Sequence, residues 1–209
     1  YVRGEGVAAV LLKPLSAARR DGDRVQAVLL GSSVGHGGRG SSQTAPNPQA
    51  QSAVAAQAWR ASGVPAELCG YIEAHGTGTK LGDAIEIEAL AGAFAGPVPG
   101  RADNIAIGSV KSVIGHLEAC SGLSALLKVV LAMRHGTLPP IGGWSRPNPL
   151  LRLGPFRLLT AAEPWRERRG QGWRRVAGIH SFGLGGTNAH LVVAQDDRAS
   201  APTPADSPV

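Results

Sequence analysis

The sequence predicts an α/β fold in which helices cover a mixed sheet, because short apolar runs alternate with segments of helical character along the chain. Gly-rich turns follow several of the apolar runs, as expected where a strand leads into a helix or a loop. Hydrophobic residues make up 43% of the chain and charged residues 17%, which is typical of a globular domain. The length of 209 residues suits one well-packed domain or part of a larger one.

Six apolar runs bounded by turn-forming residues predict buried strands. In chain order they cover 7–12, 25–30, 68–74, 105–110, 175–179 and 189–193. Pro14 closes the first run, and a turn at Asp21-Gly22 precedes the second. The last two runs flank a Gly-rich turn and are expected to pair as the closing strands of the sheet.

Four segments with helical patterns lie between the predicted strands. In chain order they cover 16–20, 50–61, 83–94 and 115–134. Pro48 leads into the second helix and Gly63 ends it, whereas Asp83 opens the third helix at the end where the helix dipole favours a carboxylate. The fourth helix is apolar on most faces, so it is expected to be buried. The stretch 35–48 predicts a long loop.

The net charge of +6 comes from 21 Lys and Arg against 15 Asp and Glu, and much of the excess lies in the Arg-rich segment 166–175. This segment is either a solvated loop or a patch that docks an acidic partner. Nucleic-acid binding is not expected, because no aromatic platform accompanies the charge.

The sequence contains no apolar stretch long enough to cross a membrane. With only two cysteines, no disulfide framework is indicated, which fits a reducing cytoplasm. Because the chain opens at Tyr1 with what looks like mid-domain sequence, we expect it to be a segment of something longer.

The two most informative residues are His75 and His116, each in its own Gly-rich turn between a predicted strand and a predicted helix. A third Gly-rich turn covers 181–190. Two imidazoles on separate turns can converge on one carbonyl oxygen, an arrangement that suits carbon–carbon bond chemistry on thioesters. Neither Cys69 nor Cys120 stands where a nucleophile would be expected.

Five blocks of the sequence together resemble β-ketoacyl synthases, and most of all the ketosynthase domains of modular polyketide synthases. The blocks read Tyr-Val-Arg-Gly-Glu-Gly over 1–6, Thr-Ala-Pro-Asn-Pro over 44–48, Glu-Ala-His-Gly-Thr-Gly-Thr over 73–79, Lys-Ser-Val-Ile-Gly-His-Leu-Glu over 111–118 and Gly-Leu-Gly-Gly-Thr-Asn-Ala-His over 183–190. The resemblance implies a thiolase-like fold of two similar halves and decarboxylative Claisen condensation of carrier-bound acyl thioesters. It places the nucleophilic Cys in the first half, upstream of this chain.

The chain therefore resembles the C-terminal half of a ketosynthase, over 1–194, with 1–13 as the last strand of the N-terminal half and 195–209 as a disordered tail. By this resemblance His75 and His116 donate hydrogen bonds to the thioester oxygen that becomes negative during decarboxylation. Lys111 corresponds to the lysine that orders the second histidine, and Glu118 to its carboxylate partner. Taken singly, either histidine could be a capped turn residue, but their place in family blocks favours catalysis.

The resemblance also implies residues that bind substrate. Thr77 and Thr79 correspond to the threonines that hydrogen-bond the phosphopantetheine arm, although both could also satisfy donors within a tight turn. In the third turn the backbone N–H of Leu184 corresponds to the second oxyanion donor, where the family usually has Phe as a gate. The neighbouring residues expected to form this part of the site are Phe182, Gly183 and Gly185.

Several residues depart from the family pattern or invite another interpretation. Val113 stands where Asn is common, and His180, where Ser or Asn is usual, is expected to be a strand-end residue bonded to backbone. His190 is expected to be structural, and His135 to end a helix.

Cys120 follows His116 by four residues and suggests a Cys–His pair on a helix, but a small buried core residue is favoured. Residues 34–38 weakly resemble ketosynthases from assembly lines with separate acyltransferases. No metal site is predicted, because no recognised ligand spacing occurs.

As an acyltransferase of the β-ketoacyl synthase type, the complete domain is expected to work with an N-terminal half that supplies the Cys, with acyl carrier protein and its phosphopantetheine, and as a homodimer. No cofactor is expected to bind this chain directly, and the chain alone is expected to be inactive. The nucleophile would come from a separate chain of a split enzyme or from a lost part of the same protein. The alternative is a non-elongating or non-catalytic half-domain that acts in acyl transfer or carrier-protein binding.

Overall fold

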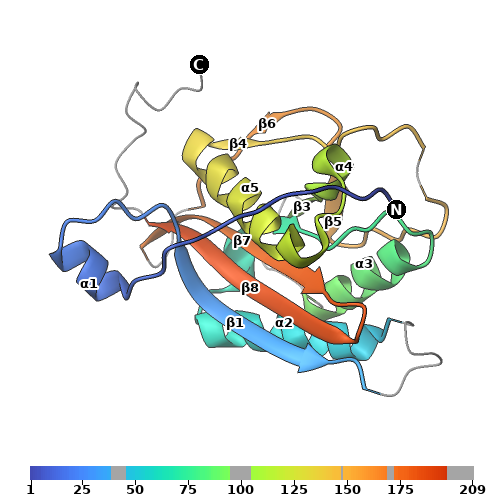
Figure 1. The fold of residues 1–209 in the computed structure, drawn as a ribbon, viewed down its shortest axis with the longest axis horizontal. Coiled ribbons are helices and arrows are strands. Elements are labelled where there is room, and N and C mark those ends of the chain that lie inside the picture. Colours follow the sequence, from blue (N-terminus) through green and yellow to red (C-terminus); the bar gives the residue numbers. More distant parts are fainter. Residues whose placement is uncertain (39–45, 95–104, 147, 169–171, 197–209) are drawn as a thin grey trace.

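The computed structural model describes residues 1–38, 46–94, 105–146, 148–168 and 172–196. Its centre is a six-stranded mixed sheet with the strand order β1-β8-β7-β2-β3-β5 (Figure 1). β8 runs antiparallel to both of its neighbours, β1 and β7, whereas β7, β2, β3 and β5 run parallel to one another. The sheet strands are β1 (Val28–His36), β2 (Cys69–Glu73), β3 (Ile105–Gly108), β5 (Phe156–Leu158), β7 (Trp173–Phe182) and β8 (Thr187–Asp196). A second, two-stranded sheet pairs β4 (Thr137–Leu138) with β6 (Glu163–Pro164).

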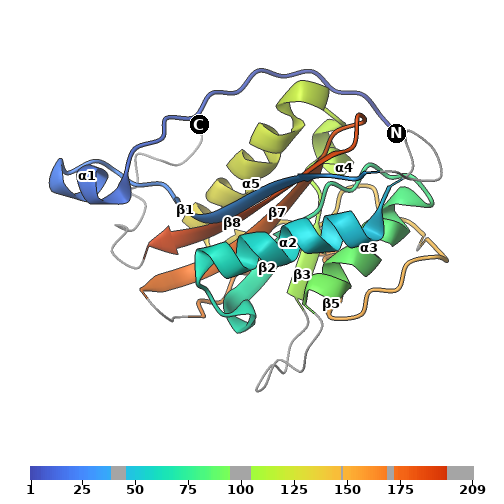
Figure 2. The same ribbon diagram turned by 90° about the horizontal axis from the view of Figure 1, so that it is seen from below.

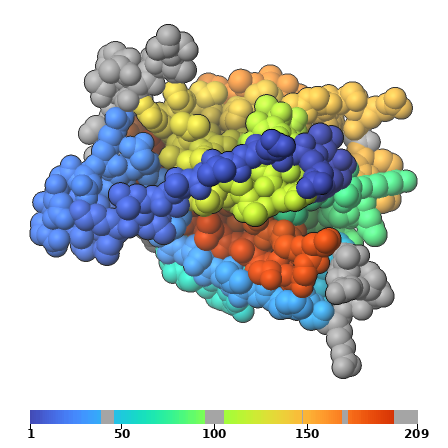
Figure 3. Space-filling view, in the orientation of Figure 1, coloured from blue at the N-terminus to red at the C-terminus, as the bar shows by residue number. Residues whose placement is uncertain are grey.

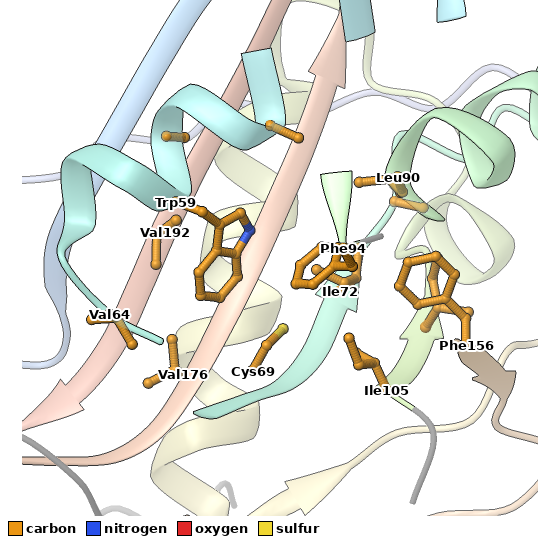
Figure 4. Close-up of a cluster of buried hydrophobic side chains, with 14 of the residues drawn as sticks. Trp59, Val64, Cys69, Ile72, Leu90, Phe94, Ile105, Phe156, Val176 and Val192 are labelled. Carbon is orange, nitrogen blue, oxygen red and sulfur yellow. The ribbon is translucent and has the colours of Figure 1, made fainter. Parts of the chain in front are cut away.

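Helices cover both faces of the large sheet, as the sequence predicts for a layered α/β fold. α2 (Pro48–Ser62) and α3 (Gly82–Ala93) lie on one face, and α5 (Ser121–His135) lies on the other (Figure 2). On the first face Trp59 and Phe94 meet edge to face, with ring centroids 5.3 Å apart, among buried side chains of β2 and β3 (Figure 4). On the second face α5 packs against a core that contains Tyr71, Met133 and Trp165. Each face of the sheet therefore has its own apolar core.

The two ends of α2 lie where the sequence has residues that begin and end helices. The Asn47 side chain accepts a hydrogen bond from the Ala50 backbone N–H at 3.1 Å, Pro48 occupies the first turn, and Gly63 ends the helix with φ 65°. β1 begins three residues after the predicted start and continues through the first part of the predicted loop, because its pairing with β8 extends to His36 and Thr187. The loop residues 39–45, which include Thr44 of the second block, lie outside the described residues.

The strand predicted over 7–12 is absent from the described structure. This segment is extended without a sheet partner, and Val7 and Leu11 are 100% and 95% exposed. A single apolar segment cannot become a strand without a neighbour that pairs with its backbone. Figure 3 shows the N-terminal segment running over the surface across α5. α1 (Leu15–Arg20) follows it and confirms the brief helix predicted there.

The helix predicted over 115–134 is shorter and begins later. A one-turn helix, α4 (Lys111–Ile114), precedes it, and the chain then leaves the helical path at Gly115, with φ 74°, and at Glu118, with φ 49°. A 3-10 turn over Glu118–Cys120 leads into α5. The prediction missed this break because the apolar periodicity continues through it, whereas the backbone is turned to bring His116 toward β2.

The predicted tail over 195–209 is wrong at its first two residues. β8 continues through Asp196, and Gln195 and Asp196 are both buried, because these residues pair with the first part of β7. Residues 197–209 lie outside the described residues. Among the helices that the structure describes, none has the length and apolar character to cross a membrane.

Candidate active site

A buried carboxylate holds the backbone of His75, which lies in the turn after β2. One oxygen of Glu86, which lies on α3, accepts the His75 backbone N–H at 2.7 Å, and the other accepts the Gly76 N–H at 2.9 Å. Gly76 has φ 48°, and a Cβ there would lie 2.7 Å from Ser109 Cβ, so the turn requires glycine. The His75 ring is buried, and its Nδ1 accepts the backbone N–H of Phe182 at 3.3 Å. Glu86 of α3 thus fixes the backbone of His75, and Phe182 of β7 fixes its ring.

The N-terminal segment holds the backbone of His116, which lies in the turn after β3. The His116 N–H donates to the carbonyl of Val2 at 2.8 Å, and the Gly4 N–H donates to the carbonyl of His116 at 3.0 Å. The ring of Tyr1 lies 5.1 Å from the imidazole, and the Glu118 backbone N–H donates to Nδ1 at 2.9 Å. The first block of the resemblance therefore contacts the second histidine directly.

The two histidines meet as the sequence predicts, with ring centroids 5.3 Å apart and ring planes at 86°. Each Nδ1 accepts a backbone N–H, so in the neutral rings each proton lies on Nε2. Burial lowers the pKa of His75 to about 4, and desolvation followed by the charge of Lys111 lowers the pKa of His116. At neutral pH the pair thus offers two Nε2–H donors.

Lys111 acts on both histidines through its charge, which lowers the pKa of each ring. Burial lowers its own pKa, and the carboxylates of Glu73 and Glu86 oppose that shift. The expected pairing of Lys111 with Glu118 is wrong: the described contacts of the Glu118 carboxylate are with Arg3 Nε at 2.9 Å and with the Tyr1 hydroxyl at 3.3 Å. Because Glu118 has a positive φ on an exposed turn, its side chain extends toward the N-terminal segment.

A second buried carboxylate, Glu73, lies at the end of β2. It pairs with Lys128 Nζ at 2.6 Å and accepts the Tyr71 hydroxyl at 2.7 Å, and its other oxygen accepts the backbone N–H of Val110. Neither Glu73 nor Glu86 was expected from the sequence to support the histidines. A detectable signal was present for Glu86, because it shares a helix face with the buried Leu90 four residues later.

The third turn lies between β7 and β8. Its own hydrogen bonds join the Gly183 N–H to the carbonyl of Thr187 at 2.8 Å and the Gly186 N–H to the carbonyl of Gly183 at 3.0 Å. Phe182 packs its ring 5.1 Å from His75, so this turn borders the histidine pair. Leu184 is 83% exposed at the tip, and the carbonyl of Gly185 faces the ring of His36.

The two predicted threonines lie together on the turn after His75, with their Oγ1 atoms 3.2 Å apart. One hydroxyl donates to the other, which leaves further donor and acceptor capacity open toward solvent. Asp83, in the first turn of α3, accepts the Gly78 N–H at 3.1 Å, and burial raises the pKa of its carboxyl to about 6.

His180 is not the strand-end residue predicted from sequence, because it is fully buried inside β7. Its Nδ1 lies 3.6 Å from Glu86 Oε1, its ring is 5.0 Å from that of His190, and burial lowers its pKa to about 3. His190 is also buried, in agreement with a structural role. Cys120 is half-buried in the 3-10 turn rather than in the core, and Cys69 is buried at the start of β2.

Comparisons with known proteins identify the family of the chain. The family described as Beta-ketoacyl synthase, C-terminal domain, matches residues 26–144. Polyketide synthase ThaG of Burkholderia thailandensis is 47% identical over 94% of this chain, and a highly reducing polyketide synthase of Aspergillus terreus is 44% identical over 92%. The chain spans only 4% and 7% of the lengths of these relatives.

Solved ketosynthase structures share the fold. The oxazolomycin ketosynthase domain OzmH KS7 of Streptomyces albus matches 88% of this chain with a TM-score of 0.80 and 45% identity, and the module 6 ketosynthase of the bacillaene synthase from Bacillus subtilis matches 87% with a TM-score of 0.79 and 37% identity. The chain covers 32% of each of those structures. The chain thus belongs to the β-ketoacyl synthase family and corresponds to the C-terminal part of a polyketide synthase ketosynthase domain.

Proposed function

We propose that the chain is the C-terminal half of a ketosynthase that catalyses decarboxylative Claisen condensation of acyl thioesters. The observation that carries this proposal is the His75–His116 pair, because both rings bind a backbone N–H at Nδ1 and so keep Nε2–H as a donor. A nucleophilic Cys, supplied by a segment N-terminal to this chain, would hold the acyl group. The chain alone would have no condensing activity.

The proposed chemistry uses the donors in sequence. A malonyl thioester loses carbon dioxide, and the electron pair of the broken bond passes to the thioester oxygen as an enolate. Two Nε2–H donors directed at that oxygen lower the barrier, by about 3 kcal/mol each if they act as other oxyanion donors do. The enolate carbon then attacks the acyl thioester, whose oxyanion accepts the Leu184 N–H, and the cysteine thiolate leaves.

Neutral imidazoles suit this role better than imidazolium. A cationic ring would lose the Nδ1 acceptor that binds Phe182 N–H or Glu118 N–H, and the ring orientation with it. Lys111, whose charge lowers the pKa of both rings, would keep the pair neutral. Lys111 is therefore proposed to act electrostatically, without the Glu118 contact.

The proposed partners follow from this chemistry. The malonyl and acyl groups would arrive on the phosphopantetheine arm of an acyl carrier protein, and the paired hydroxyls of Thr77 and Thr79 suit the amides of that arm. The N-terminal half would cover the exposed apolar segment over 7–12, and the complete domain would form a homodimer. A chain with only two cysteines and no disulfide framework fits a cytoplasmic enzyme.

The test is malonyl-carrier decarboxylation by the protein with its complete ketosynthase domain. His116→Ala should lower the rate by about 10²-fold or more, the effect of removing one oxyanion donor. His135→Ala is the matched control, because His135 is exposed at the end of α5. Decarboxylation by His116→Ala at the rate of the unmodified protein would contradict the proposal.

A second candidate is a ketosynthase that transfers acyl chains without extending them. Leu184 at the tip of the third turn favours it, because the family usually has Phe at this position. Such a protein would acylate its Cys but yield no extended product from malonyl carrier protein. Mass spectrometry of the carrier-bound product separates the two candidates.

A further inference from the structure

His36, the last residue of β1, joins two backbone segments through its ring. Nε2 lies 3.0 Å from the carbonyl oxygen of Gly185, and the Gly38 N–H donates to Nδ1 at 2.9 Å. A ring nitrogen that accepts an N–H carries no proton, so the neutral ring is protonated on Nε2 and donates to Gly185. Both ring nitrogens are thereby committed to backbone partners.

The surroundings of His36 hold this ring against the third turn. The Gly37 N–H donates to the carbonyl of Gly186 at 2.8 Å, and Asn47 Nδ2 donates to the carbonyl of Gly37 at 2.7 Å. Gly186 has φ 94°, and a Cβ there would lie 2.9 Å from His36 Nε2. The N-terminal end of α2 is thus connected, through Asn47 and the segment 36–38, to the turn that carries Leu184.

The tip of that turn has little else to hold it among the described residues. Leu184 is exposed, and a Cβ at Gly185 would find no atom within 4 Å. Without packing at the tip, its position depends on hydrogen bonds. Among the hydrogen bonds described above, the bond from His36 Nε2 is the one in which a side chain contacts Gly185.

We propose that His36 is a positioning residue that latches the turn over 183–186 through the Gly185 carbonyl and so sets the position of the Leu184 N–H. The second part rests on the proposed function, because it gives that N–H the role of donor to the acyl thioester. The latch itself can be tested without any activity. Because the ring is exposed, water competes with the latch, and the turn can open.

Three substitutions at position 36 separate the latch from a general effect on loop shape. His36→Phe keeps a planar ring but removes both hydrogen bonds. In His36→Gln the side-chain Nε2 replaces the donor to Gly185, whereas in His36→Asn the Oδ1 replaces only the acceptor for Gly38 N–H. His135→Phe is the matched control at an exposed histidine far along the chain.

The measurement is hydrogen exchange of the Gly183 and Gly186 amides in the complete protein, with β2 (Cys69–Glu73) as an internal reference for the intact fold. His36→Phe and His36→Asn should exchange about fivefold faster in the turn, the factor that corresponds to ~1 kcal/mol for one net hydrogen bond. His36→Gln and His135→Phe should exchange at the unmodified rate. Unchanged exchange in His36→Phe, or equal protection by Asn and Gln, would overturn the latch.

The functional part is measured as acylation of the ketosynthase Cys, against malonyl decarboxylation in the same preparations. His36→Phe should slow acylation about tenfold while decarboxylation, which depends on the histidine pair, is retained, and His36→Gln should restore acylation. Faster exchange with unchanged acylation would overturn the positioning role. A protein that neither acylates nor decarboxylates would refute the proposed function, and the exchange rates would still decide the latch.

Discussion

The turns that carry His75 and His116 follow neighbouring parallel strands, β2 and β3, yet they are held in different ways. His75 is buried, and its backbone is fixed by the carboxylate of Glu86 from within the core of the chain. His116 is half-exposed, and its backbone pairs with Val2 and Gly4 of an extended segment that belongs to no sheet in the described structure. Similar positions on the sheet therefore have different kinds of support.

The difference shows how the donor pair is assembled. The position of His75 depends on interactions that form whenever the sheet and α3 pack, so it should persist as long as the domain is folded. The position of His116 depends on residues 1–4, whose continuation over 7–12 is exposed and apolar. Order at the second histidine should therefore be lost first when the N-terminal segment is disturbed.

Removal of the Glu86 carboxylate should have the largest effect. Glu86→Ala leaves the buried N–H groups of His75 and Gly76 without acceptors, so the free energy of unfolding should fall by about 2–4 kcal/mol, measured by urea denaturation. Glu88→Ala is the matched control, because Glu88 is exposed on the same helix. Equal stability of the two variants would contradict a buried carboxylate anchor for His75.

Displacement of the N-terminal segment should have a smaller, local effect at His116. A Cβ at Gly4 would lie 2.3 Å from the carbonyl oxygen of Ile114, so Gly4→Ala must move the segment away from the turn. Decarboxylation should fall by about tenfold, as expected for one loosened donor of the pair, while hydrogen exchange of the His75 amide stays unchanged.

Arg3→Met is the companion variant for Gly4→Ala. It removes the exposed ion pair between Arg3 and Glu118, whose side chains are 74% and 51% exposed, so stability should change by less than ~1 kcal/mol. A loss of activity as large as that of Gly4→Ala would show that the ion pair, and not the backbone pairing, holds His116.

The smallest expected effect is a shift in pH dependence. The midpoint of the acidic limb of the wild-type decarboxylation rate should lie below pH 6.5, the ordinary histidine value, because the pKa of both rings lies lower and that of His75 is about 4. Lys111→Met removes a charge that opposes protonation, so the acidic limb of the rate profile should move to higher pH. An acidic limb with its midpoint at pH 6.5 in the unmodified protein would contradict the lowered pKa values of His75 and His116.

Much of the fold could be predicted because strands and helices leave local patterns. β2 and β3 lie within the predicted runs 68–74 and 105–110, and Pro48 and Gly63 delimit α2 as predicted. The run 7–12 has the same apolar pattern and yet forms no strand, because pairing requires a neighbour that periodicity does not reveal. The missed break between α4 and α5 also depends on φ values at Gly115 and Glu118, which apolar spacing does not report.

The candidate site shows the same limit. His75 and His116 could be found because each stands in a Gly-rich turn after a strand, and the structure brings them together. The groups that hold the two backbones come from residues distant in sequence, Glu86 for His75 and Val2 for His116, although the Glu118 N–H that binds the His116 ring is only two residues away. The family resemblance implied Glu118 as the partner of Lys111, although a positive φ directs Glu118 toward Arg3.

The most direct test of the central claim is the tautomeric state of the two histidines, measured by long-range ¹H–¹⁵N correlation spectra of the histidine-labelled protein at neutral pH. The hydrogen bonds from Phe182 and Glu118 predict that both rings are neutral, with a bare Nδ1 and a protonated Nε2. A protonated Nδ1 in either ring, or an imidazolium at pH 7, would contradict the account, since the pair could not then offer two oriented Nε2–H donors.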